Sequence, residues 1–282
     1  GTVTGVQTCA LPISDRKASL DLTLPVLVQA HPDYGFEHWE AHRKLEPHWK
    51  ECWEGIQREG IVSAGAGVLL NQYAYFLNDQ GRYTEAEPLL VEALEIRRQS
   101  LPERHQQIAT SLNNLAGLYF RQGRNTEAEP LYNEALEISR QSLPEGHPQI
   151  ATSLNNLAGL YQSQRRYPEA EPYFVEALGI LRHALPEGHP QIAGNMNNLA
   201  VLYDAQGEHE KAEQYFQQAI ESLEKSLGKY HPHTENSIRN LFRSYLARGK
   251  RQEAIALQKK YPIIISADLV KPEEPQDAET KE

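Results

Sequence analysis

One eight-residue motif returns along this chain at a fixed interval of 42 residues. Residues 112–119 read LNNLAGLY, and residues 154–161 repeat the same letters. Related segments begin at Leu70, Met196 and Ile238, so five units follow one another without an insertion. A fixed period of this length is typical of a solenoid, in which each unit packs on its neighbours and shares a continuous core.

Each unit is predicted to contain two helices. In the first helix the apolar residues Leu112, Leu115, Ala116 and Tyr119 fall at helical spacing, i, i+3, i+4 and i+7. The small alanine in this stripe lets a neighbouring helix approach closely.

A second block, Glu-Ala-Glu-Pro, opens the second helix at residues 85–88, 127–130 and 169–172. Thr84 or Thr126 is the expected N-cap, and the acidic residues face the positive end of the helix dipole. The prolines are expected within about the first turn, where a missing N–H costs least.

Glycine is expected to end the first helix in the left-handed conformation. Four units have it at the same position: Gly81, Gly123, Gly207 and Gly249. The third unit has Arg165 there. That unit must either accept backbone strain or end its helix in another way.

The composition argues against several classes of partner. The formal net charge is −10, and no dense stripe of Lys and Arg reverses it locally, so nucleic acid is an unexpected partner. No apolar run reaches the ~18 residues that span a bilayer. The two cysteines, Cys9 and Cys52, form no CxxC pair, which predicts a reducing, cytoplasmic setting without a zinc site. Cys52 is expected to be a packed thiol beside Trp53.

Two recurring sets of residues could suggest a metal site or an acid–base pair, but the repeat pattern argues against both. Histidines recur in the linkers, but successive repeats stand about 10 Å apart, whereas zinc needs nitrogens at about 2 Å. These histidines are therefore predicted to be structural, either in the inter-repeat loops or at helix starts: His105, His147, His189 and His231. Glu85 and Glu87 recur in the following units, which favours capping over acid–base catalysis. No phosphate loop or nucleophile elbow occurs, so no enzyme and no cofactor are predicted.

These patterns resemble the tetratricopeptide repeat family. The match is carried by Leu112-x2-Leu115-Ala116-x2-Tyr119 followed by Ala128-x3-Tyr132, with Leu in place of the consensus Trp and Ala in place of its Gly. The 42-residue period, the Asn-Asn-Leu-Ala core and the Gly-His-Pro linker resemble the kinesin-light-chain-like subclass. Over residues 61–261 the resemblance implies an all-α, right-handed superhelical solenoid of about five helix-turn-helix repeats that binds protein segments.

The remaining segments are interpreted separately. Residues 1–14 resemble sequencing-adapter read-through and are expected to be non-native, the alternative being a short natural linker. Residues 15–60 are predicted to form an N-terminal helical cap, and residues 61–262 the solenoid. The cap also resembles the segment that precedes such repeats in bacterial NB-ARC-type signalling ATPases. Residues 263–282 hold six acids against two bases, which predicts a disordered acidic tail.

A row of asparagines is the best candidate for binding. These side chains lie off the apolar stripe, on the side expected to line the concave groove: Asn71, Asn113, Asn155 and Asn197. An asparagine amide both donates and accepts, and about 10 Å between rungs matches about three residues of extended peptide at ~3.3 Å each. The resemblance implies the same role, because groove-facing asparagines hold cargo peptides in kinesin-light-chain-like domains. The competing interpretation is that they are polar packing residues, the role expected of the neighbouring Asn114, Asn156, Asn198 and Asn240.

Positions further along the same helices differ between repeats and would provide side-chain specificity. They are Tyr75, Asn78, Arg121, Gln162, Asp204, Arg239 and Arg243. The three arginines hint at an acidic ligand. The first hypothesis is therefore a scaffold that binds a protein or peptide segment, with neither nucleic acid nor membrane as partner. The alternative is a ligand-sensing or autoinhibitory repeat region of a larger NB-ARC-type ATPase, with a nucleotide-binding domain in cis. A third hypothesis is self-assembly.

Overall fold

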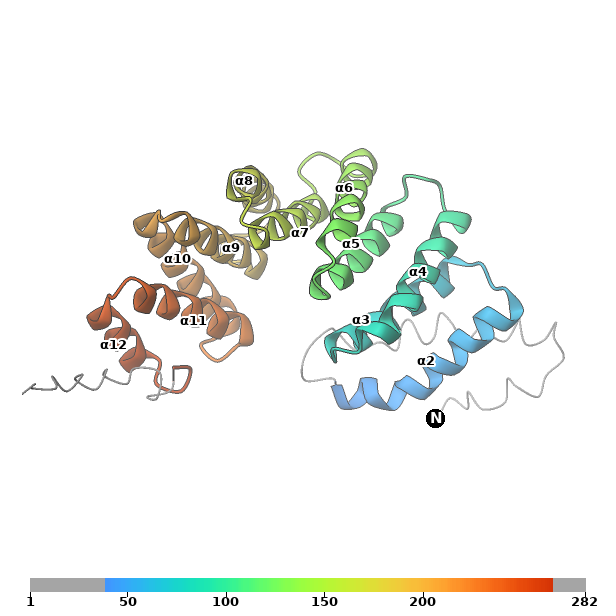
Figure 1. Cartoon of the computed structure of the whole chain (residues 1–282), viewed down its shortest axis with the longest axis horizontal. Helices are drawn as coiled ribbons and strands as arrows, with labels where there is room; N and C mark the ends of the chain where they lie inside the picture. The colour runs from blue at the N-terminus through green and yellow to red at the C-terminus, as the bar shows by residue number, and fades with distance from the viewer. Residues whose placement is uncertain (1–38, 266–282) are drawn as a thin grey trace, which may run out of the picture. The chain divides into compact units, whose positions relative to one another are not determined.

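The computed structural model describes residues 39–265, and this part of the chain is built from eleven α-helices without a strand (Figure 1). The predicted all-α repeat fold is confirmed. The read-through prediction for residues 1–14 falls outside the described residues, as do most of the acidic tail and the start of the cap.

The chain divides after Glu145 into two compact parts, which are called unit 1 and unit 2 from here on. Each of them contains several of the 42-residue repeats, which are called repeats 1 to 5. Unit 1 contains α2 (Trp39–Glu59), α3 (Ala64–Asp79), α4 (Tyr83–Ser100), α5 (Gln106–Arg121) and α6 (Asn125–Ser142). Unit 2 contains α7 (Pro148–Ser163), α8 (Tyr167–Ala184), α9 (Pro190–Gln206), α10 (His209–Leu227), α11 (Pro232–Ala247) and α12 (Arg251–Lys260).

Consecutive helices pack in pairs, and each pair is one repeat. Repeats 1 and 2 are α3–α4 and α5–α6 in unit 1, and repeats 3, 4 and 5 are α7–α8, α9–α10 and α11–α12 in unit 2. Within each unit, the first helix of a repeat also packs on the second helix of the repeat before it, as α5 does on α4 and α11 on α10. The core is therefore continuous from repeat to repeat inside a unit.

The core uses the positions that the periodicity predicts. The small residues of the first helices are completely buried: Ala74, Ala116, Ala158 and Ala200. The cap helix α2 covers repeat 1, because Trp49 packs against Tyr73 and Phe76 with ring centroids 5.7 and 5.3 Å away. Cys52 is buried in the same layer, and burial raises the pKa of its thiol to about 11. The prediction of a packed thiol is confirmed.

The turns inside the repeats follow the predicted glycine rule. The four glycines adopt positive φ, with values of 75° at Gly81, 76° at Gly123, 84° at Gly207 and 68° at Gly249. Arg165 adopts the same left-handed conformation with φ of 59°, and no other non-glycine residue of the described part does so. The third repeat thus keeps the turn and accepts the strain that a Cβ brings there.

The histidines of the linkers have a structural role at helix starts, one of the two predicted locations, and the structure adds that they are N-caps. Each accepts a hydrogen bond at Nδ1 from the backbone N–H two residues on, at 3.2 Å in α5, α7 and α9 and 3.3 Å in α11: His105, His147, His189 and His231. They satisfy one of the N–H groups that a helix start leaves unpaired.

The predicted start of the second helices is wrong. Arg82 and Arg124 are the N-caps of α4 and α6, and neither makes a side-chain capping bond. Since α4 begins at Tyr83, Pro88 is its sixth residue and lies in the second turn. Thr84, whose carbonyl loses its partner N–H to this proline, is exposed, so water can satisfy that carbonyl.

Packing extends three residues beyond the predicted end of the solenoid. Ile264 and Ile265 are buried, and Arg239 of α11 donates from Nε to the carbonyl of Ile264 at 3.4 Å. These residues lie against α11 on the side where a further first helix would follow.

Candidate peptide-binding surface

The asparagine row begins in unit 1 at a buried seam between two first helices. Asn71 is only 6% exposed. Its amide nitrogen donates to the carbonyl of Gly67 at 2.9 Å and to Ser111 Oγ at 3.0 Å, and its oxygen accepts from Asn114 Nδ2 at 3.0 Å. Both donors of Asn71 are therefore used inside the protein, and its bonds to Ser111 and Asn114 join α3 to α5.

Unit 2 repeats this seam with fewer bonds. Asn195 of α9 donates to Asn155 Oδ1 of α7, and Asn240 of α11 donates to Asn197 Oδ1 of α9 at 3.3 Å. Asn195 occupies the repeat position that Ser111 has in unit 1, so an amide side chain replaces a hydroxyl there. Within residues 39–265, the structure gives the amide N–H groups of Asn155 no partner, and this side chain is only partly buried.

A buried guanidinium completes the seam in unit 1. Arg97, which is 4% exposed, donates from Nη1 to the carbonyl of Gln107 and to Ser111 Oγ, both at 2.8 Å. Gly67 makes room for it, because a Cβ at that glycine would lie 2.9 Å from Arg97 Cγ. No motif in the sequence predicted this buried guanidinium. The signal was Gly67 itself, which stands where the other four repeats have Ala109, Ala151, Ala193 and Glu235.

The variable positions in unit 1 place an aromatic ring beside opposite charges. Tyr75 of α3 is 45% exposed, and Arg121 of α5 is exposed. Burial and the charge of Asp79 raise the pKa of Tyr75, whereas the charge of Arg121 lowers it, so the three groups share one electrostatic neighbourhood. Asn78 is partly buried near the end of α3.

The variable positions in unit 2 differ in how far their side chains are shielded or paired inside the protein. Gln162 is partly buried, and its Nε2 is shielded from solvent without a hydrogen-bond partner among the described residues. Arg239 pairs with Glu235 at 2.9 Å besides contacting Ile264. Arg243 is exposed. Thus Arg121 and Arg243 are the arginines that the structure leaves most available on the first helices.

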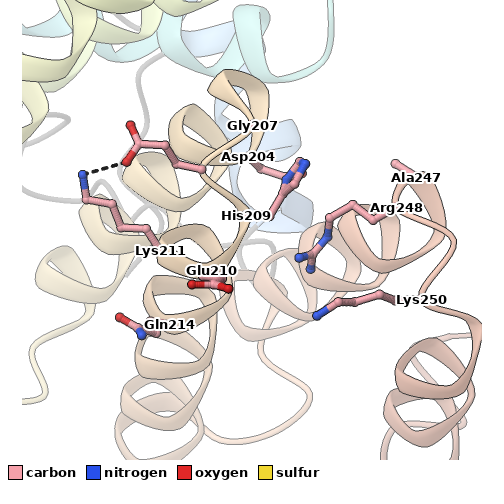
Figure 2. Close-up of a pocket in the computed structure, with 10 residues that line it drawn as sticks. Asp204, Gly207, His209, Glu210, Lys211, Gln214, Ala247, Arg248 and Lys250 are labelled. Atoms are coloured by element: carbon pink, nitrogen blue, oxygen red, sulfur yellow. Dashed lines mark hydrogen bonds and ion pairs between the residues drawn. The ribbon is translucent and has the colours of Figure 1, made fainter.

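Asp204 lies at the edge of a cavity of about 1000 Å³ in unit 2. Its Oδ1 accepts from Ser244 Oγ at 2.8 Å and lies 2.9 Å from His209 Nδ1. Figure 2 shows Arg248 and Lys250 on the opposite side of this cavity, near the α11–α12 turn. The cavity lies between the edges of repeats 4 and 5, and no pattern in the sequence predicted it.

A partly buried carboxylate beside this cavity pairs with the two cations. Glu213 accepts from Tyr245 Oη at 2.8 Å and from Lys250 Nζ at 3.1 Å, and Arg248 lies 3.4 Å away. Burial alone would raise the pKa of Glu213, but these hydrogen bonds and charges outweigh burial and lower it. The positive groups of this edge are therefore already partly neutralised.

The recurring acidic block has partners that its sequence did not reveal. Arg124 lies 3.9 Å over the Tyr119 ring, pairs with Glu127 at 2.7 Å, and reaches both oxygens of Glu87 in the preceding repeat at 2.9 Å. Arg124 thereby lowers the pKa of Glu127. These carboxylates are ion-paired along the edge of the repeats, in addition to any effect on the helix dipole.

Repeat 4 reverses this edge pair. Glu208 takes the position of the arginine, and Lys211 takes that of its glutamate, with 3.2 Å between Lys211 Nζ and Glu208 Oε2. Lys211 also takes over the aromatic contact, lying 3.8 Å from the Tyr203 ring centroid. The same contact is therefore preserved with the charges exchanged.

Within residues 39–265, no group of three or more His, Cys, Asp or Glu side chains is placed to hold a metal ion. No helix in this range is long and apolar enough to cross a membrane.

Comparison with known proteins agrees with this architecture. Solved structures similar to the chain include the nearly identical TPR-like repeats of a candidate kinesin light chain from Podosopora anserina, at 28% identity and a TM-score of 0.59, covering 69% of this chain and 92% of that one. BtubC (BKLC) from P. vanneervenii is 25% identical with a TM-score of 0.61, covering 93% and 97%. The apo form of RapI, at 20% identity and a TM-score of 0.59 over 70% and 69%, shares the fold.

Among curated proteins, no sequence relative matches. The tetratricopeptide repeat family matches in four overlapping windows: residues 66–141, 107–183, 149–225 and 191–261. Together these windows run from the first residues of repeat 1 to the end of repeat 5, so the chain belongs to the tetratricopeptide repeat family.

Proposed function

We propose that this chain is a non-catalytic protein-interaction scaffold whose first helices bind an extended peptide segment. Membership of the tetratricopeptide repeat family supports the scaffold role. The observation that carries the peptide proposal is Asn155, because its amide oxygen is held by Asn195 while its N–H groups have no partner in the described part of the chain. An amide fixed in this way can donate to a peptide carbonyl without first breaking an internal bond.

We divide the asparagine row by the contacts that each side chain makes. Asn71 is committed to the α3–α5 seam, and Asn197 is buried and accepts from Asn240. We therefore assign backbone recognition chiefly to Asn155 and to the partly buried Asn113. Asn71 and Asn197 position the first helices.

Specificity is assigned to the exposed side chains of the first helices. Tyr75 offers an aromatic surface next to Arg121 in unit 1, and Arg243 offers a second exposed guanidinium in unit 2. A guanidinium pairs with a carboxylate through two parallel hydrogen bonds. A peptide with an acidic residue close to an apolar one fits the Tyr75–Arg121 neighbourhood best.

The test is a displayed random peptide library selected on the purified chain, followed by affinity measurement of a selected peptide on variants. Asn155→Ala is expected to lower the free energy of unfolding by about 1–3 kcal/mol, because the buried Asn195 loses its acceptor, while the chain stays folded. It is also expected to weaken peptide binding about fivefold, the equivalent of one hydrogen bond. Arg121→Gln is expected to lower the affinity of the chain for peptides that contain an acidic residue. Asn133→Ala is the matched control, because this exposed asparagine of α6 donates to the Glu129 carbonyl of its own helix at 3.0 Å and so makes a bond that is local to one helix.

Two outcomes would contradict the proposal. One is that Asn155→Ala unfolds the chain, which would make this side chain structural. The other is that selected peptides bind Asn155→Ala and Arg121→Gln as tightly as the unmodified chain. The alternative role, as the repeat region of an NB-ARC-type ATPase, stays a prediction from the sequence before repeat 1.

A further inference from the structure

The second helices of unit 1 are joined by an ion pair. Arg98 near the end of α4 donates from Nη2 to both carboxylate oxygens of Glu134 in α6, at 2.7 and 2.9 Å. The pair spans 36 residues. In unit 1, the arginine at this repeat position therefore pairs with a carboxylate of the next second helix.

Unit 2 has the arginine at this position without the carboxylate. Arg182 of α8 and Gln218 of α10 stand two periods, or 84 residues, after Arg98 and Glu134. Within residues 39–265, the contact that the structure gives Arg182 is with Met196, whose sulfur lies 3.7 Å from Nη2. A neutral amide cannot replace the charge of a carboxylate, so the guanidinium keeps its capacity for an anionic partner.

Arg182 and Gln218 line a cavity of about 860 Å³ between α8, α9 and α10. The apolar lining comes from Ile192 and Met196, which are 7% and 6% exposed. Lys225 adds a second cation to the walls, and Ser222 adds a hydroxyl. The cavity therefore combines an apolar surface with a guanidinium that lacks the partner seen in unit 1.

Two acidic residues limit what the cavity can accept. Glu187 and Glu221 also line it and are exposed. With two carboxylates and two cations, the lining carries no excess of positive charge. It therefore disfavours a run of acidic residues and suits a single carboxylate that reaches Arg182.

We propose that this cavity is a second protein-binding site, which takes one Glu or Asp side chain of a partner segment together with an adjacent apolar side chain. The carboxylate occupies the place that Glu134 has in unit 1 and pairs with Arg182. The apolar side chain packs on Ile192 and Met196. This site lies among the second helices and α9 of unit 2, so it does not depend on the first-helix surface proposed above.

Met196 provides a direct probe, because it is the single methionine of the sequence. A carbon-13 label on methionine methyl groups reports on the apolar lining of the cavity, and Met196→Leu assigns the signal. The labelled chain is titrated with N-acetyl-leucyl-glutamyl amide, and N-acetyl-leucyl-glutaminyl amide is the matched neutral peptide. The expected result is a saturable shift of the Met196 methyl signal with the acidic peptide, and binding about tenfold weaker for the neutral one.

Three variants separate the pocket from non-specific binding. Arg182→Gln is expected to reduce binding of the acidic peptide about tenfold. Gln218→Glu places the missing carboxylate inside the protein, as in unit 1, and is expected to block the site by a similar factor. Arg98→Gln removes the corresponding arginine of unit 1 and should leave the titration unchanged.

The proposal is overturned if the methyl signal shows no saturable shift up to about 10 mM peptide. It is also overturned if both peptides bind equally, or if Gln218→Glu binds the acidic peptide as well as the unmodified chain. Thermal unfolding of each variant is measured alongside. Because Gln218→Glu forms a new pair, a folded Gln218→Glu chain keeps the test decisive even if Arg182→Gln is destabilised.

Discussion

The junction between repeats 1 and 2 and the junction between repeats 4 and 5 place different residues at equivalent positions. In unit 1 the seam contains Gly67, Arg97 and Ser111, and the guanidinium is buried against the serine. At the junction between repeats 4 and 5, three periods later in the sequence, the corresponding residues are Ala193, Leu223 and Ser237, and all three are buried.

Between these two junctions, the residues at two packed positions change together. The long side chain of Arg97 occurs with a glycine, since a Cβ at Gly67 would lie 2.9 Å from Arg97 Cγ. The shorter Leu223 occurs with Ala193. Close packing of the interior requires this exchange, because an added methyl group at one position must be compensated by the neighbour.

The strongest way to break the comparison is to move the arginine into unit 2. Leu223 is 1% exposed, and Ala193 leaves it no extra room. Leu223→Arg buries a charge without the glycine and is expected to lower the free energy of unfolding by roughly 3–5 kcal/mol. Chemical denaturation measures this, with Leu223→Met as the control that keeps volume and polarity. A loss below about 1 kcal/mol would mean that the α10–α11 seam opens easily to solvent.

A smaller effect is expected from adding one methyl group in unit 1. Gly67→Ala should lower the free energy of unfolding by about 1–3 kcal/mol through overpacking. Gly67→Ala combined with Arg97→Leu recreates the alanine–leucine–serine set of the 4–5 junction and should recover part of this loss. A double-mutant cycle by chemical denaturation gives the coupling energy. Strict additivity of the two changes would refute the coupled-pair interpretation.

The control for this change is another helical glycine. An added Cβ at Gly179 of α8 meets no atom within 4 Å. Gly179→Ala is therefore expected to raise the free energy of unfolding by up to about 1 kcal/mol, because alanine favours the helix.

The smallest effect concerns the electrostatic edge of the 4–5 junction, where Glu213 has a lowered pKa. A carboxyl whose folded-state pKa is depressed stabilises the fold above its unfolded value of 4.5. That contribution is lost as the pH falls through the lower, folded value. Glu213→Gln should therefore flatten the loss of stability below about pH 4.5. Denaturation at several pH values measures the slope, with the exposed Glu210→Gln as control. Equal slopes for the two variants would show that Glu213 makes no such contribution.

The fold could be predicted because its main features are local and periodic. The apolar spacing, the buried Ala116 and the His105 cap all depend on residues within about one helical turn of each other. The N-cap prediction failed because it chose the residue type that usually caps a helix, whereas α6 begins at Asn125 with Arg124 as N-cap, directly after the left-handed Gly123. The pairing of Arg124 with Glu87, 37 residues earlier in the preceding repeat, is not local in sequence and could not be predicted.

The binding surface was harder to predict for the same reason. Asn71 and Asn155 have the same place in the repeat, but Asn71 meets Ser111 and Asn155 meets Asn195. Which amide groups stay available depends on residues 40 positions away. The Asn195 substitution could have indicated this, because it breaks the serine at 111, 153 and 237.

The short segment after α12 has a consequence for association between molecules. A repeat stack offers the same apolar surface at its last helix pair as it does between repeats, so an open end is a surface to which a further copy can add. Ile264 and Ile265 are buried there, and the Ile264 carbonyl accepts from Arg239 on the α11 surface. This segment therefore covers part of the α11 surface with the chain's own backbone, which reduces the apolar area that a further copy could contact there.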